Sequence, residues 1–188
     1  MQSWSRCKAF LLCLLLPLPL LAASGAETED APAPRLVILE KARFIGDYLP
    51  GAAGPASRLR PDAALMARAA EKYRITPRDQ TYELVLAHGG AIFLETVYEE
   101  GSLLLGLVLS DELRVLKAAL LEVSPRYKAD FDGATGTGIL TRYTMMSARQ
   151  LRYLASQLSK QGPAGEVVGN GIHHMGAVLA TVLEQRAP

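Results

Sequence analysis

The N-terminal segment constrains this chain more than any other feature of the sequence. Residues 9–23 carry no charge, they follow the basic side chains of Arg6 and Lys8, and small residues occupy positions 24–26. A positive segment, an apolar run of about 7 to 15 residues and small residues before a cut together make a secretory signal peptide. We therefore expect residues 1–26 to be a signal peptide that is removed during export.

The main alternative is a retained membrane anchor. An anchor needs about 20 apolar residues, and Pro17 and Pro19 interrupt this shorter run. We expect no transmembrane span after cleavage and a periplasmic or secreted location. The mature chain should begin at Glu27 or, if the cut follows Ser24, at Gly25.

Removal of the signal peptide also removes both cysteines, Cys7 and Cys13. A mature chain without a thiol excludes a disulfide framework, a cysteine nucleophile and a thiolate metal site. The 20 basic residues of the whole chain lose Arg6 and Lys8, which leaves 18 basic residues against 19 acidic ones. This near-neutral balance does not indicate nucleic-acid binding.

Residues 27–34 are polar and contain two prolines, so we expect a flexible leader. No second linker-like stretch follows, and we expect residues 35–188 to form a single compact domain. About 150 residues are enough for one packed core.

Apolar residues at helical spacing run through most of this domain. Local start signals support several helices, among them Thr76 before Pro77 and the capping-box pair of Ser147 and Gln150. Residues 103–109 and 139–146 fit either a strand or a helix. The prediction is a mainly α fold of about five to seven helices, with room for a minor β-hairpin. The predicted helices cover residues 35–49, 61–73, 77–88, 91–100, 110–124, 147–161 and 172–185.

Charge is segregated along the domain. Residues 79–113 contain seven acids and no lysine or arginine, whereas residues 126–160 contain six basic residues and two acids. Such stretches either are solvated and pair with each other within one fold, or form docking surfaces for charged partners. The candidate interaction surface comprises Glu95, Glu99, Glu100, Arg142, Arg149 and Arg152.

Metal and cofactor motifs are incomplete. Of the three histidines, His173 and His174 would point about 100° apart on a helix, which is a poor geometry for sharing one ion. We expect this pair to lie at the surface or at the start of a helix. The stretch 130–136 departs from calcium-loop spacing, and we expect a glycine-rich surface loop there. No nucleotide-binding or serine-hydrolase motif is present. We expect no metal and no cofactor.

Two glutamates are weak candidates for catalysis. Glu95 lies among apolar residues, which could raise its pKa and make it a general acid on a glycan. Glu99 follows four residues later and would share one exposed helical face with Glu95. This spacing does not favour a catalytic pocket.

The function that fits best is therefore an exported, soluble accessory protein of the cell envelope that binds a protein partner and is not an enzyme. One alternative is a hydrolase or lyase of envelope glycan that uses a glutamate general acid. Another is a helical binder of a small apolar ligand, with residues 103–109 and the C-terminal helix as pocket walls. The sequence leaves the oligomeric state open.

Overall fold

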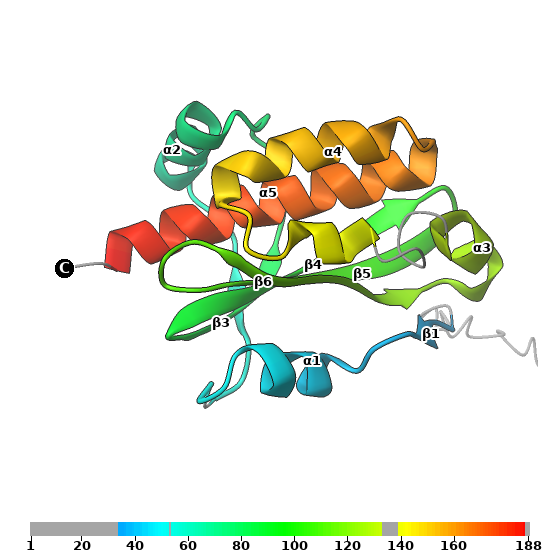
Figure 1. Ribbon diagram of the computed structural model, residues 1–188, viewed down its shortest axis with the longest axis horizontal. Helices are drawn as coiled ribbons and strands as arrows, with labels where there is room; N and C mark the ends of the chain where they lie inside the picture. The colour runs from blue at the N-terminus through cyan, green and yellow to red at the C-terminus, as the bar shows by residue number, and fades with distance from the viewer. Residues whose placement is uncertain (1–33, 53, 133–138, 187–188) are drawn as a thin grey trace, which may run out of the picture. The chain divides into compact units, whose positions relative to one another are not determined.

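A six-stranded antiparallel sheet forms the centre of the domain (Figure 1). The computed structural model describes residues 34–52, 54–132 and 139–186. Across the sheet the strand order is β1-β6-β5-β4-β3-β2. The strands are β1 (Leu36–Val37), β2 (Ser57–Leu59), β3 (Tyr82–Ala87), β4 (Gly89–Tyr98), β5 (Gly101–Leu109) and β6 (Val115–Val123).

Helices cover both faces of this sheet to different extents (Figure 1). The long helix α5 (Pro163–Arg186), with α2 (Ala63–Tyr73) and α4 (Leu151–Ser159), packs on one face. The short helix α1 (Lys41–Tyr48) lies against the other face. The remaining short helices are η1 (Pro125–Tyr127), α3 (Lys128–Phe131), η3 (Ile139–Tyr143) and η4 (Ala148–Gln150).

Strand β5 shows how the two faces are divided. Leu103, Leu105 and Leu107 point toward α5, whereas Val108 joins the cluster under α1. Gly106 also faces α1, where a β-carbon would lie only 3.0 Å from the ring of Phe44. The absence of a side chain at this position therefore lets α1 approach the sheet closely.

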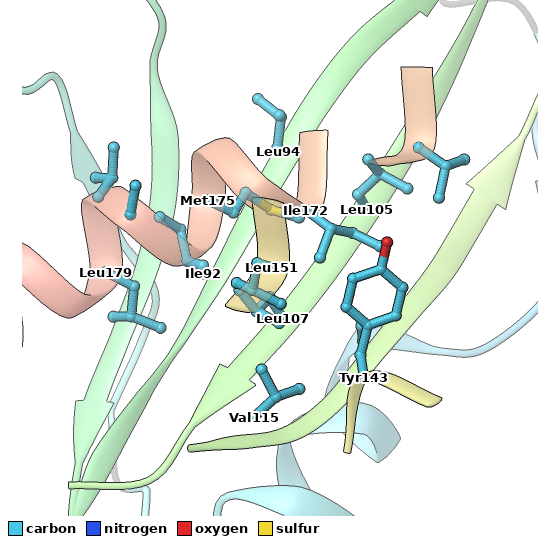
Figure 2. Packing of buried hydrophobic residues seen from close by; sticks show 14 of the residues in the cluster. Ile92, Leu94, Leu105, Leu107, Val115, Tyr143, Leu151, Ile172, Met175 and Leu179 are labelled. Atoms are coloured by element: carbon cyan, nitrogen blue, oxygen red, sulfur yellow. The ribbon is translucent and has the colours of Figure 1, made fainter. Parts of the chain in front are cut away.

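The larger core fills the space between the sheet and α5 (Figure 2). Ile172 and Met175 of α5 face the strands, and Leu151 of α4 packs beside them. The ring of Tyr143, from η3, closes the same cluster near Leu105.

The mainly α prediction was wrong. Three of the predicted helices, at residues 77–88, 91–100 and 110–124, correspond to strands β3, β4 and β6. The central strands are covered on both faces over much of their length, although the second half of β4 is open on the α1 face. The covered parts are nearly continuous apolar runs without the clean alternation of a half-exposed strand. Such runs also satisfy a helical spacing, and the pattern alone does not separate the two.

The pair Gly89-Gly90 separates the predicted helices at 77–88 and 91–100, but in the structure it begins β4, directly after the turn from β3. Ala87 pairs with Gly89 across this tight turn, and Gly89 has a φ of 101°. This left-handed backbone favours glycine.

Other helix predictions were correct in type but not in all of their bounds, since α5 begins at Pro163 rather than at residue 172 and the segment at 147–161 is divided into η4 and α4. Helices α2, α4 and α5 overlap the predicted helices at 61–73, 147–161 and 172–185, and the capping box of Ser147 and Gln150 is formed. The predicted helix at 35–49 is reduced to α1, with β1 before it. Of the two ambiguous stretches, 103–109 belongs to β5 and 139–146 contains the 3-10 helix η3. The predicted signal peptide and nearly all of the predicted leader lie outside the described residues.

Candidate functional site

A basic cleft opens on the helical side of the sheet, between α2, η4 and the last turns of α5. Its volume is about 680 Å³. Four of its side chains are cationic and two are acidic. The lining residues are Arg68, Glu71, Lys72, Arg74, Arg149, Thr181, Glu184 and Gln185.

The amphipathic pattern of α2 supplies one wall of this basic cleft. Asp62 caps the helix by accepting a hydrogen bond from the backbone N–H of Leu65 at 2.7 Å. Ala69 and Tyr73 face the core, so the charged residues between them point outward. The helix ends at Arg74, whose φ of 60° turns the chain sharply at the edge of the cleft.

The opposite wall begins at the capping box of Ser147. The backbone N–H of Ser147 donates to the side-chain oxygen of Gln150 at 2.9 Å, which fixes the start of the helical segment. Arg149 lies inside this first turn, and its charge acts on Glu184 across the cleft. A local capping motif therefore determines where Arg149 stands.

Glu184 is the anion at the centre of the basic cleft, and it is already engaged. Lys72 donates to it at 2.6 Å and the hydroxyl of Tyr73 donates to it at 2.5 Å. Burial alone would raise the pKa of Glu184, but these two hydrogen bonds and the charges of Lys72 and Arg149 outweigh it and lower the pKa. Within the described residues, Arg74 and Arg149 form no ion pair, so the basic cleft keeps an excess of positive charge.

Two buried histidines of α5 hold the segment that follows α2. The Nε2 atom of His173 donates to the carbonyl of Tyr73 at 3.0 Å, and that of His174 donates to the carbonyl of Thr76 at 2.9 Å. The other ring nitrogen of His174, Nδ1, accepts from the hydroxyl of Tyr82 at 2.6 Å. These bonds fix His174 as a neutral imidazole with its proton on Nε2.

Burial lowers the pKa values of both histidines, and the nearby charges of Arg152 and Arg78 lower those of His173 and His174 further. The expectation of a surface or helix-start role for the pair was wrong, because both side chains lie mid-helix and are less than a tenth exposed. Their nitrogens serve to attach the α2 segment to α5. Among the described residues, no group of three or more His, Cys, Asp and Glu is arranged to hold a metal ion.

The glutamates singled out in the sequence do not share a site. Glu95 lies on the α1 face of β4, where its side chain is 59% exposed and pairs with Arg35. Arg35 also reaches Glu122 at 3.4 Å. Glu99 lies in the turn after β4 with a φ of 51°, so the expected common helical face is absent. This arrangement does not favour Glu95 as a general acid.

Three of the seven acids of the acidic stretch, Glu95 among them, pair with basic residues from upstream in the chain. Glu83 pairs with Lys41, and Asp79 pairs with Arg60 at 2.6 Å. Among the described residues, one ion pair joins the acidic stretch to the basic one, between Glu100 and Arg126 at 2.8 Å. Local neutralisation therefore explains much of the acidic stretch without a partner.

The basic residues singled out in the sequence lie in two places. Arg149 lines the basic cleft, and Arg152 follows it on α4, near enough to His173 to affect its pKa. Arg142 stands apart on η3, beside a different hollow. Sequence reasoning missed Arg68, Lys72 and Arg74, whose charges join those of α4 only because α2 packs beside η4.

The proposed walls of an apolar ligand pocket are packed against each other. A β-carbon on Gly171 of α5 would lie 2.5 Å from Leu105 of β5, and one on Gly176 would lie 2.1 Å from Leu151 of α4. Space of ligand size is therefore absent at these contacts between the described residues of β5, α4 and α5. The stretch 130–136 is described only up to Asp132, which ends α3; residues 133–136 lie outside the described part.

None of the described helices is both long and apolar enough to cross a membrane. No family model, curated protein or solved structure matches this chain.

Proposed function

We propose that this chain is an exported, non-enzymatic interaction protein that docks an acidic segment of a protein partner in the basic cleft. The observation that carries this proposal is the charge excess of the cleft. Lys72 and Glu184 neutralise each other, which leaves Arg68, Arg74 and Arg149 against Glu71.

An acidic polypeptide matches the cleft better than a neutral ligand. Arginine binds carboxylates through paired, charge-assisted hydrogen bonds, and several arginines around one hollow attract an acidic chain over a distance and speed its association. The cleft volume of about 680 Å³ also accommodates several side chains. The hydrogen bonds from Lys72 and Tyr73 help to lower the pKa of Glu184, which keeps this carboxylate ionised and does not favour a general-acid role for it.

A fluorescein-labelled hexaglutamate peptide provides the direct test. Its affinity for the mature chain is measured by fluorescence anisotropy over a range of salt concentrations. The double variant Arg74→Gln/Arg149→Gln should bind about 2- to 30-fold more weakly, since each of the two exposed ion pairs contributes about 0.2–1 kcal/mol. The dependence of binding on salt should weaken in the same variant.

The matched control is Arg58→Gln/Arg142→Gln, which removes the same charge from exposed arginines outside the cleft. This control should retain the affinity of the unmodified protein. An equal loss of affinity in both double variants would mean that the peptide responds only to net charge, and the docking proposal would then be wrong.

A further inference from the structure

A second hollow lies between β4 and the first half of α5, on the side of His174. Its volume is about 390 Å³. We call it the β4–α5 groove. The side chains that give it a polar lining are Arg78, Gln80, Thr96, Glu99, Glu166 and Asn170.

The relative direction of β4 and α5 orders these side chains along the groove. A β-carbon on Gly90 would touch Leu179, and a β-carbon on Gly171 would lie 3.7 Å from Leu94. The strand and the helix therefore run antiparallel. The end of β4, which carries Glu99, consequently lies toward the start of α5, which carries Glu166. The two carboxylates belong to the same end of the groove.

The cation lies at the other end. Arg78 lines the groove together with His174 and follows by two residues Thr76, whose carbonyl accepts a hydrogen bond from His174 at 2.9 Å, so Arg78 lies near that histidine. His174 follows Glu166 by eight residues, which is about 12 Å along a helix. Within the described part of the chain, Arg78, Glu99 and Glu166 form no ion pair, so both ends keep their charge.

Neutral polar groups occupy the space between the charged ends. Asn170 is one helical turn from both Glu166 and His174. Gln80 and Thr96 line the groove from the sheet side. All three side chains are half-buried, and none makes a hydrogen bond to another described residue. The groove thus offers hydrogen bonds along its length and opposite charges at its ends.

We propose that the β4–α5 groove binds a short, unblocked peptide of two or three residues. The amino terminus would lie at Glu99 and Glu166, and the terminal carboxylate would lie at Arg78. An extended chain spans about 3.3–3.6 Å per residue, so three residues cover about 10–11 Å, close to the separation of the two ends. The peptide groups pair with Gln80, Thr96 and Asn170. This binding site is independent of the basic cleft.

Trialanine is the probe, because all of its charge is at its termini. Calorimetric titration of the mature chain at low salt compares trialanine with its N-acetylated and C-amidated forms. Each blocked form should bind at least tenfold more weakly. In the Glu166→Gln variant, trialanine and its N-acetylated form should bind with equal affinity. In the Arg78→Gln variant, trialanine and its C-amidated form should bind with equal affinity. Glu112→Gln, an exposed glutamate in the β5–β6 turn, is the matched control and should change neither.

Two results would overturn the proposal: no heat from millimolar trialanine with folded protein, or equal affinity for trialanine and its blocked forms. The variant Arg74→Gln/Arg149→Gln should bind trialanine normally. If this variant lost trialanine binding, the peptide would bind in the basic cleft, and the proposal for the β4–α5 groove would be wrong. Failure of hexaglutamate binding, in contrast, bears only on the basic cleft.

Discussion

Removal of the phenolic oxygen should affect stability differently at two equally buried tyrosines. Tyr82 is 1% exposed and Tyr143 is fully buried. The hydroxyl of Tyr82 donates to Nδ1 of His174 at 2.6 Å. The hydroxyl of Tyr143 has no hydrogen-bond partner among the described residues and points into the core beside Leu105 and Ile172 (Figure 2). The change from Tyr to Phe deletes the same atom at both positions.

The two variants differ in whether a buried hydrogen-bonding group loses its partner. Tyr82→Phe leaves the buried Nδ1 of His174 without a donor, and an unsatisfied buried acceptor costs about 1–3 kcal/mol. At about 2–4 °C per kcal/mol for a chain of this size, its Tm should fall by about 2–12 °C. Tyr143→Phe breaks no hydrogen bond and relieves the desolvation of one hydroxyl, so its free energy of unfolding should stay constant or rise by up to about 1 kcal/mol.

Urea unfolding at neutral pH measures both changes, and circular dichroism checks that each variant keeps its secondary structure. The decisive quantity is the difference between the two changes in the free energy of unfolding, because the two tyrosines are matched in ring size and burial. If Tyr143→Phe destabilised the protein as much as Tyr82→Phe does, the hydrogen-bond assignment of the core would be wrong.

Three further predictions concern pH, capping and export. Burial lowers the pKa values of His173 and His174 in the folded chain. As the pH falls below about 6.5, these two imidazoles therefore bind protons in the unfolded chain before they do so in the folded chain. The free energy of unfolding should then drop by at most about 1.4 kcal/mol per pH unit for each histidine. Replacing both histidines with glutamine should flatten this pH dependence, measured by urea unfolding at several pH values, whereas the control His88→Gln, at an exposed turn, should not. Asp62→Ala should cost about 1 kcal/mol because the cap of α2 is lost, and unchanged urea midpoints would contradict this. Intact mass of the exported product should begin at Glu27 or Gly25, and recovery of the full-length chain in membranes would contradict cleavage.

The charge clusters show why much of the site was not predictable. Lys72 and Glu184 are 112 residues apart in the chain, and Arg149 approaches them from a third segment. Only the packing of α2, α4 and α5 brings these side chains together. In the same way, Glu95 forms an ion pair with Arg35, which lies 60 residues upstream in the chain. The acidic stretch therefore looked free in the sequence, although much of it is paired.

What the sequence determined by itself is local. Ser147 and Gln150 form their capping box from side chains three residues apart, and the apolar stripe of α2 follows from helical spacing, so these helices could be predicted. Tertiary structure decided the strands. Residues of β3, β4 and β6 satisfy their backbone hydrogen bonds only through neighbouring strands, and their burial on both faces removes the alternation that would mark them. The sheet, and with it the position of every helix on its faces, depends on contacts that no local pattern specifies.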